Sequence, residues 1–80
     1  MDITVRVFAA YADALGRAEV PLVLPDGATV DDAVRSVSTL PGGQVIPRSP
    51  LVAVNHTYAS AAVRLNEGDE VALIPPVSGG

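Results

Sequence analysis

The sequence predicts one α+β domain of 80 residues, in which a single main helix crosses a mixed sheet. Short apolar runs rich in β-branched residues recur along the chain and predict strands. Only one stretch repeats its apolar residues at helical spacing over two turns. Apolar residues make up 49% of the chain, so a core can form and a disordered chain is not expected.

The first strand is predicted at residues 3–9, where apolar residues alternate with others. One face of this strand holds Ile3, Val5 and Val7. Phe8 falls on the opposite, more polar face, and we therefore expect it to be an exposed aromatic side chain.

A short helix and a second strand are expected next. Residues 10–15 are rich in alanine, and Gly16 stands where a helix often ends in a left-handed glycine. Residues 19–24 have the composition of a strand. Pro21 within them cannot donate a backbone hydrogen bond, which favours an edge position or an irregular start of the strand.

The main helix is predicted from residue 30 to about residue 39. Thr29 is a good N-cap, and Asp31-Asp32 stand in the first turn, where the helix dipole favours acids. The apolar residues follow the spacing i, i+3, i+4, i+7, namely Val30, Ala33, Val34 and Val37. Pro41-Gly42-Gly43 cannot continue the helix, and residues 44–50 are expected to be a loop.

The second half of the chain is predicted to supply the remaining strands. The apolar run 51–55 is expected to be central, and Asn55-His56 suits a tight turn into a short return segment at 57–59. Residues 64–69 are polar turn material, and residues 70–74 form the last strand. With the last strand beside the first, this order of elements is the layout of the β-grasp fold, the roll of ubiquitin.

A flexible tail, residues 75–80, is expected after a domain that covers residues 1–74. Its two prolines hold the backbone extended, and its two final glycines leave it thin and free. Such a tail can reach about 20 Å, enough to deliver a terminal carboxylate into a deep channel of a partner. A frayed terminus is the ordinary interpretation of a tail like this.

Composition excludes several classes of function. The chain has no cysteine, hence no thiol nucleophile and no cysteine metal site. Its net charge is −4, which argues against nucleic acid as a partner. No apolar run approaches the roughly 20 residues of a membrane span, and we expect a cytoplasmic protein without a membrane partner. Lysine is absent, so no side-chain amine is available for self-acylation, although a genome biased towards arginine codons explains the same count.

Other polar groups indicate little independent chemistry. His56 is the single histidine, and without a second metal ligand of its kind we expect a structural role and no metal site. Asp31-Asp32 are explained by the helix N-terminus, and Gly42-Gly43 is too short for a phosphate cradle. An acidic patch near the root of the tail is equally compatible with a solvated turn and with a docking patch for a basic surface: Glu67, Asp69 and Glu70.

Two stretches have the pattern of a known family. They are Val52-Ala53-Val54-Asn55-His56-Thr57, and Asp69-Glu70-Val71-Ala72 leading to Pro75-Pro76-Val77-Ser78-Gly79-Gly80. By these stretches the chain, from Ile3 to Gly80, resembles the ubiquitin-like sulfur carriers, and within them the small subunits of molybdopterin synthase. The Asn-His pair is a departure, because Asn-Gly or Asn-Gln is more usual at that turn.

The resemblance implies a sulfur carrier for molybdenum cofactor biosynthesis. An ATP-using partner similar to the ubiquitin-activating enzyme would adenylate the Gly80 carboxylate, and a sulfur donor would displace AMP to leave a thiocarboxylate. The large subunit, in an expected heterotetramer, would then use this sulfur on a pterin precursor. The chain would bind no cofactor itself and would act as a co-substrate. Its partners would bind the tail at Pro75, Pro76, Val77, Ser78 and Gly79.

Alternatives remain open at this point. The sulfur could go instead to thiamine, cysteine or a tRNA base, or the chain could be a ubiquitin-like modifier whose Gly80 joins a target lysine. Both begin with adenylation, so the tail does not separate them. A β-grasp interaction module with an incidental tail is a third interpretation.

The partner interface is predicted at Phe8, Tyr58 and Ile74. Val71 and Leu73 take the inward parity of the last strand, so Ile74 points outward, beside Phe8 if the two strands are adjacent. By the resemblance, Tyr58 matches a position at which the small subunits place an apolar contact. An exposed apolar cluster usually marks an interface; the alternative is that Phe8 folds over the edge of the core.

Overall fold

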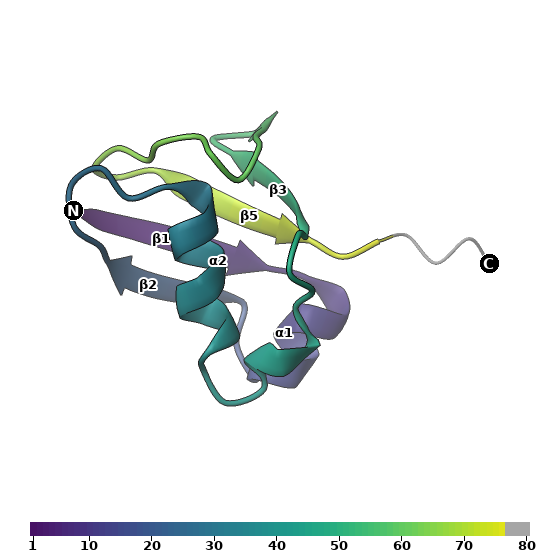
Figure 1. The fold of residues 1–80 in the computed structure, drawn as a ribbon. Helices are drawn as coiled ribbons and strands as arrows, with labels where there is room; N and C mark the ends of the chain where they lie inside the picture. The colour runs from purple at the N-terminus through teal and green to yellow at the C-terminus, as the bar shows by residue number, and fades with distance from the viewer. Residues whose placement is uncertain (77–80) are drawn as a thin grey trace.

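Five strands form one mixed sheet in the order β2-β1-β5-β3-β4 (Figure 1). β1 (Asp2–Val7) pairs antiparallel with β2 (Glu19–Val23) and parallel with β5 (Glu70–Ile74). β3 (Leu51–Val54) pairs antiparallel both with β5 and with the two-residue β4 (Thr57–Tyr58). The last strand therefore returns beside the first, as the order of elements predicts.

The computed structural model describes residues 1–76. Within these residues, no helix has the length and apolar character that a membrane crossing requires. β5 ends at Ile74 and leads into Pro75 and Pro76. The remaining four residues of the predicted tail lie outside the described part of the chain.

The two helices begin and end within one residue of the predicted positions. α1 (Ala9–Leu15) ends at Gly16, which is left-handed with a φ of 73°. α2 (Val30–Ser38) begins at Thr29, whose hydroxyl accepts from the Asp32 amide at 3.4 Å while the Asp32 carboxylate accepts from the Thr29 amide at 2.8 Å. This reciprocal pair satisfies two amide groups that a helix N-terminus leaves free.

The apolar run 51–55 forms an inner strand of the sheet, as expected, because β3 lies between β5 and the short β4. The middle strand of the five is β5. Val52 and Ala53 are both buried although they point to opposite faces. Ala53, on the face that carries no helix among residues 1–76, has Ala72 and Tyr58 as its neighbours on the adjacent strands. Pro21 does lie in an edge strand, β2, as predicted.

The core lies between α2 and one face of the sheet (Figure 1). The strand residues of one parity are almost fully buried there, with Val5, Val71 and Leu73 at 0% exposure. The apolar face of α2 packs against them through Val30, Ala33, Val34 and Val37. Among residues 1–76, no helix crosses the opposite face of the sheet, so this face is open.

The predicted loop after α2 contains a short 3-10 helix, η1 (Gly43–Val45). Gly42 and Gly43 come so close to α1 and α2 that a Cβ atom on either would overlap a backbone carbonyl oxygen, of Ala14 and Val37 respectively. The glycine pair therefore allows the chain to pack closely against both helices.

Candidate functional site

The open face of the sheet is built by the outward parity of its strands. The register pairs Ala72 of β5 with Arg6 of β1 on one side and with Ala53 of β3 on the other. Ala53 in turn pairs with Tyr58 of β4. A row of two small alanines is thus flanked by large side chains.

This row of alanines forms the floor of a depression of about 490 Å³. Its walls come from four strands or their ends, because neighbouring strands bring distant residues together. The depression is lined by Phe8, Ala53, His56, Tyr58, Glu70, Ala72 and Ile74. The three residues predicted as a partner interface therefore lie around one hollow.

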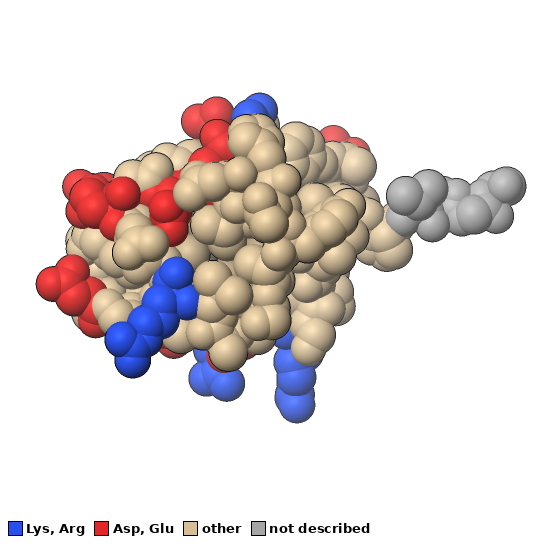
Figure 2. Space-filling model, turned by 90° about the horizontal axis from the view of Figure 1, so that it is seen from above, with Lys and Arg blue, Asp and Glu red and all other residues tan. Residues whose placement is uncertain are grey.

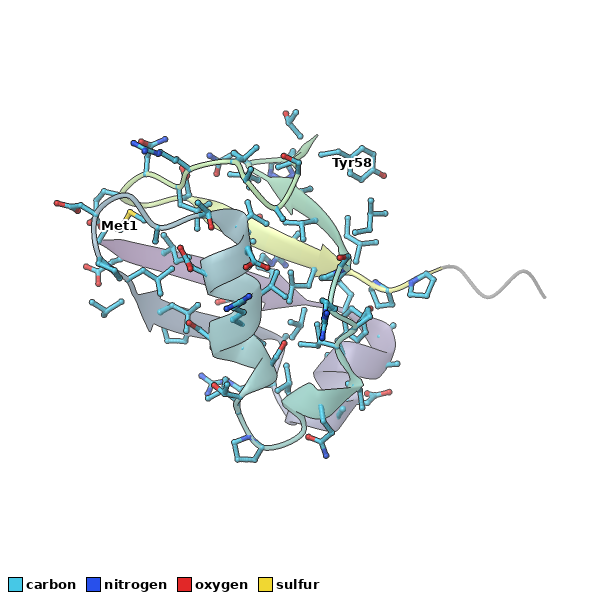
Figure 3. The ribbon with its side chains drawn as sticks, viewed as in Figure 1. Met1 and Tyr58 are labelled. Carbon is cyan, nitrogen blue, oxygen red and sulfur yellow. The ribbon has the colours of Figure 1, made fainter. Side chains whose placement is uncertain are left out.

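The aromatic walls of the depression are accessible. Phe8 is 41% exposed and Tyr58 is 71% exposed, and Ile74 is half-buried. Phe8 is also absent from the buried core cluster, which speaks against its folding over the edge of the core. Figure 3 shows Tyr58 pointing outward near the end of the sheet where β5 ends, whereas Met1 lies at the other end.

Charged groups border the depression along β1. The Arg6 guanidinium lies 3.8 Å from a carboxylate oxygen of Glu70 and 4.0 Å from one of Glu19. Its carbon lies 5.6 Å from the centre of the Phe8 ring. Exposed ion pairs of this kind contribute little to stability, but together with the aromatic contact they hold Arg6 beside the depression. Sequence reasoning did not single out Arg6 or the two alanines.

A hydrogen-bonded cluster fixes the turn at one side of the depression to the start of β5. The Asn55 side-chain amide donates to Asp69 at 2.9 Å, and its oxygen accepts from the Glu70 amide at 3.0 Å. The other Asp69 oxygen accepts from the Asn66 amide at 2.7 Å. These bonds hold together two turns that lie far apart in sequence, and so they position His56 and Tyr58 against β5.

Comparison with known proteins places the chain. The profile described as the ThiS family matches residues 5–80. The chain belongs to the ThiS family. A molybdopterin synthase sulfur carrier subunit from Chlamydomonas reinhardtii is 34% identical, with both proteins covered over their full lengths.

Solved structures share the fold of this ThiS family chain, the ubiquitin-like β-grasp. SAMP1, a small archaeal modifier protein from Haloferax volcanii, is 30% identical, with a TM-score of 0.86 and full coverage of both chains. A chain in the complex of subunits 1 and 2 of the molybdopterin-converting factor from Helicobacter pylori has a TM-score of 0.74, also with full coverage of both. Its 20% identity limits that likeness to the fold.

The acidic patch expected near the root of the tail is not formed in this ThiS family chain. Asp69 is only 8% exposed and lies in the Asn55 cluster, while Glu70 faces Arg6 on the sheet. Glu67 is exposed and accepts from the Asp2 amide at 2.9 Å. All three stand before or at the start of β5, whereas the tail follows its end. Figure 2 likewise shows most acidic side chains of that view at the end of the molecule away from residue 76.

The structure describes only two of the tail residues that are predicted to react or to be bound by partners. Pro75 is half-buried and Pro76 is exposed directly after β5. Val77, Ser78, Gly79 and Gly80 lie outside the described residues, and their roles stay predictions. Within residues 1–76, no group of three histidine, cysteine or acidic side chains could hold a metal ion.

Proposed function

We propose that the chain is the sulfur-carrier subunit of a molybdopterin synthase. The observation that supports this most is the 34% identity, over full length, to a sulfur carrier subunit of that enzyme. The accessible depression at the end of β5 supports it further, because a carrier must be held by its partners close to the point where its tail begins.

The chemistry proposed for Gly80 begins with activation. A carboxylate is a poor acyl donor because its oxygen is a bad leaving group, so the Gly80 carboxylate attacks the α-phosphorus of ATP and pyrophosphate leaves. Hydrosulfide from a sulfur source then attacks the acyl carbon, the bond to AMP breaks, and loss of the proton on sulfur leaves a thiocarboxylate. An adenylating partner supplies the catalytic groups for both steps, so that the chain itself is a co-substrate.

The tail supplies reach rather than catalysis in this proposal. The six residues after Ile74 span at most about 20 Å. In a partner that binds the depression, the reacting atoms must therefore lie within this distance of the point where the tail begins. Gly79 and Gly80 carry no side chain that would crowd an adenylate or hinder attack by sulfur.

The depression is the proposed docking surface for both partners in turn, the adenylating enzyme and the synthase large subunit. Phe8, Tyr58 and Ile74 are the proposed anchors, since apolar and aromatic side chains in a hollow supply much of the binding energy of protein interfaces. The adenylating enzyme delivers the thiocarboxylate form, and the large subunit then passes its sulfur to a pterin precursor.

Mass spectrometry after incubation with the adenylating enzyme, ATP and a sulfur source tests the central step. We expect a mass gain equal to the exchange of one oxygen for one sulfur, located on Gly80 by fragmentation. A matched variant with one alanine appended after Gly80 keeps the whole domain and should gain no sulfur. Thiocarboxylation of the appended variant without trimming would refute the terminal carboxylate as the reacting group.

A protein modifier is the second candidate, favoured by the likeness to SAMP1 at 30% identity. In that case Gly80 forms an isopeptide bond with a lysine of another protein. Denaturing gels of cells that express a tagged chain separate the two functions. Covalent adducts that disappear when Gly80 is removed support a modifier, whereas pterin thiolation by the purified large subunit with the thiocarboxylated chain supports the carrier.

A further inference from the structure

Left-handed backbone gathers at the borders of the depression. Among residues 1–76, the residues other than glycine with positive φ are Ala9 at 48°, Asn55 at 49° and His56 at 72°. Ala9 directly follows Phe8, and the other two form the turn before β4. Side chains other than glycine rarely take this conformation because of steric strain, and such strain tends to collect at functional sites.

Two of these three residues are explained by the fold. Asn55 tolerates the left-handed region well, and its side chain bonds to Asp69 and the Glu70 amide. Ala9 has an exposed side chain of one carbon and begins α1. Its left-handed backbone turns the chain from β1 into that helix.

His56 enters the left-handed region more readily than most residues do, but the fold gives its side chain no partner among residues 1–76. In a two-residue hairpin turn with both residues left-handed, glycine is still the preferred second residue. The His56 imidazole is exposed and, within residues 1–76, makes no hydrogen bond and no ion pair. It nevertheless lines the depression next to Tyr58 and Glu70. The fold therefore tolerates a strained residue whose ring is directed to a surface and bonded to nothing in the described chain.

We propose that His56 is a specificity-determining contact of the docking surface. The inference rests on the proposed function. The partner seats an apolar side chain on the Ala53–Ala72 floor and places an arginine or lysine beside it, at the border formed by His56 and Glu70. An imidazole nitrogen that carries no hydrogen accepts a hydrogen bond from that cation.

Charge favours a cation over an anion at this border. Glu70 contributes a carboxylate that is 37% exposed, and its ion pair with Arg6 is long, at 3.8 Å. The whole chain carries a net charge of −4. Arg6 lies between Glu19 and Glu70 and offsets one of these two negative charges. A basic group of a partner therefore still meets one net negative charge together with the imidazole acceptor.

The test compares His56→Gly with Ala9→Gly in the full chain. Both substitutions relieve left-handed strain, and both should raise Tm by about 2–6 °C. Only His56→Gly removes a side chain that lines the depression. Titration calorimetry with the purified synthase large subunit should give a Kd about five-fold or more weaker for His56→Gly, the usual effect of one lost hydrogen bond, and an unchanged Kd for Ala9→Gly.

Three further variants make the outcome decisive. His56→Asn accepts the left-handed backbone but is too short to replace the imidazole, so it should also weaken binding. Glu70→Gln should weaken binding and reduce its dependence on salt. If Phe8→Ala weakens binding while His56→Gly and His56→Asn do not, the inference about His56 is wrong and the docking surface stands. If none of these variants changes Kd, the docking surface proposed above is wrong as well.

Discussion

Two glycines show how single residues set the packing of this domain. Gly42 and Gly27 have nearly the same φ, 87° and 88°. A Cβ atom on Gly42 would overlap the Ala14 carbonyl, whereas one on Gly27 would meet no atom within 4 Å. An alanine at Gly27 would therefore introduce left-handed strain alone, whereas one at Gly42 would introduce both strain and steric overlap.

We expect Gly42→Ala to lower the free energy of unfolding by about 2–5 kcal/mol, the sum of left-handed strain and overpacking. Gly27→Ala should lower it by only about 1–2 kcal/mol, from strain alone. Urea denaturation of both variants measures the difference. Equal losses would mean that α1 moves away from Gly42 at little cost.

Phe8 offers a second prediction at the residue scale. Because its side chain lies outside the core cluster, Phe8→Ala should change the free energy of unfolding by less than about 1 kcal/mol. The same change should weaken binding to the synthase large subunit by about 1–3 kcal/mol. Val23→Ala is the matched control, because Val23 is 80% exposed but lies on the edge strand and outside the depression. A Phe8→Ala variant that unfolds easily yet binds normally per folded molecule would place Phe8 in the core.

At the scale of the element, β2 is protected as an edge strand. The Val7 amide donates to the Ala18 carbonyl, and the Leu24 amide donates to the Met1 carbonyl. The backbone N–H and C=O groups of the even-numbered residues between 18 and 24 therefore point towards β1, and those of the odd-numbered residues point away from the sheet. Pro21 is therefore at an outward position, where its missing N–H leaves no ladder bond unmade. The Arg17 side chain also donates to the outward Glu19 carbonyl at 2.8 Å. Both features discourage pairing with a strand of another molecule.

Pro21→Val should consequently keep the fold and increase self-association. Valine restores an outward amide donor and has a high strand propensity. Sedimentation velocity over a range of protein concentrations measures the effect, with Leu22→Val as a control on the inward parity of the same strand. A Pro21→Val variant that associates no more than the parent chain would show that Arg17 and the short strand length already protect the edge.

Local signals made most elements predictable from the sequence. The Thr29 cap, Gly16 and the Asn55-His56 turn each depend on residues within a few positions, so the ends of both helices and the hairpin were correctly predicted. The middle position of β5 and the burial of Asp69 depend on pairing between distant segments. Asp69 has the same local sequence character as an exposed turn acid, and only its contact with Asn55 distinguishes it.

The residues of the candidate site were likewise predictable only where a local sequence pattern determines their position. Alternation along β1 and β5 predicted the outward direction of Phe8 and Ile74. The floor of the depression was missed, because Ala53 and Ala72 become neighbours only through the register of β3 on β5. Alanine alone gives no sequence signal of function. His56 was assigned a structural role because a lone histidine is a weak metal signal, and its left-handed backbone became visible only in the structure.

At the scale of the whole molecule, the parallel pairing of β1 and β5 places the depression and the start of the tail at the same end. The depression is lined by Ile74, and Pro75 follows directly. When one partner occupies the depression and the tail, a second partner cannot bind to either of them. The proposed function therefore requires the adenylating enzyme and the large subunit to bind in turn.

This requirement predicts competition. Adding the purified large subunit should slow thiocarboxylation of the chain in proportion to the fraction bound, as followed by mass spectrometry over time. A variant that ends at Pro76 keeps the described domain and the depression but lacks Gly80. It should therefore inhibit thiocarboxylation of the intact chain by occupying the adenylating enzyme, and Phe8→Ala in that variant should relieve the inhibition. A stable ternary complex of both partners with one chain, detected by native mass spectrometry, would show that they bind different surfaces. A single depression cannot be occupied by both partners at once.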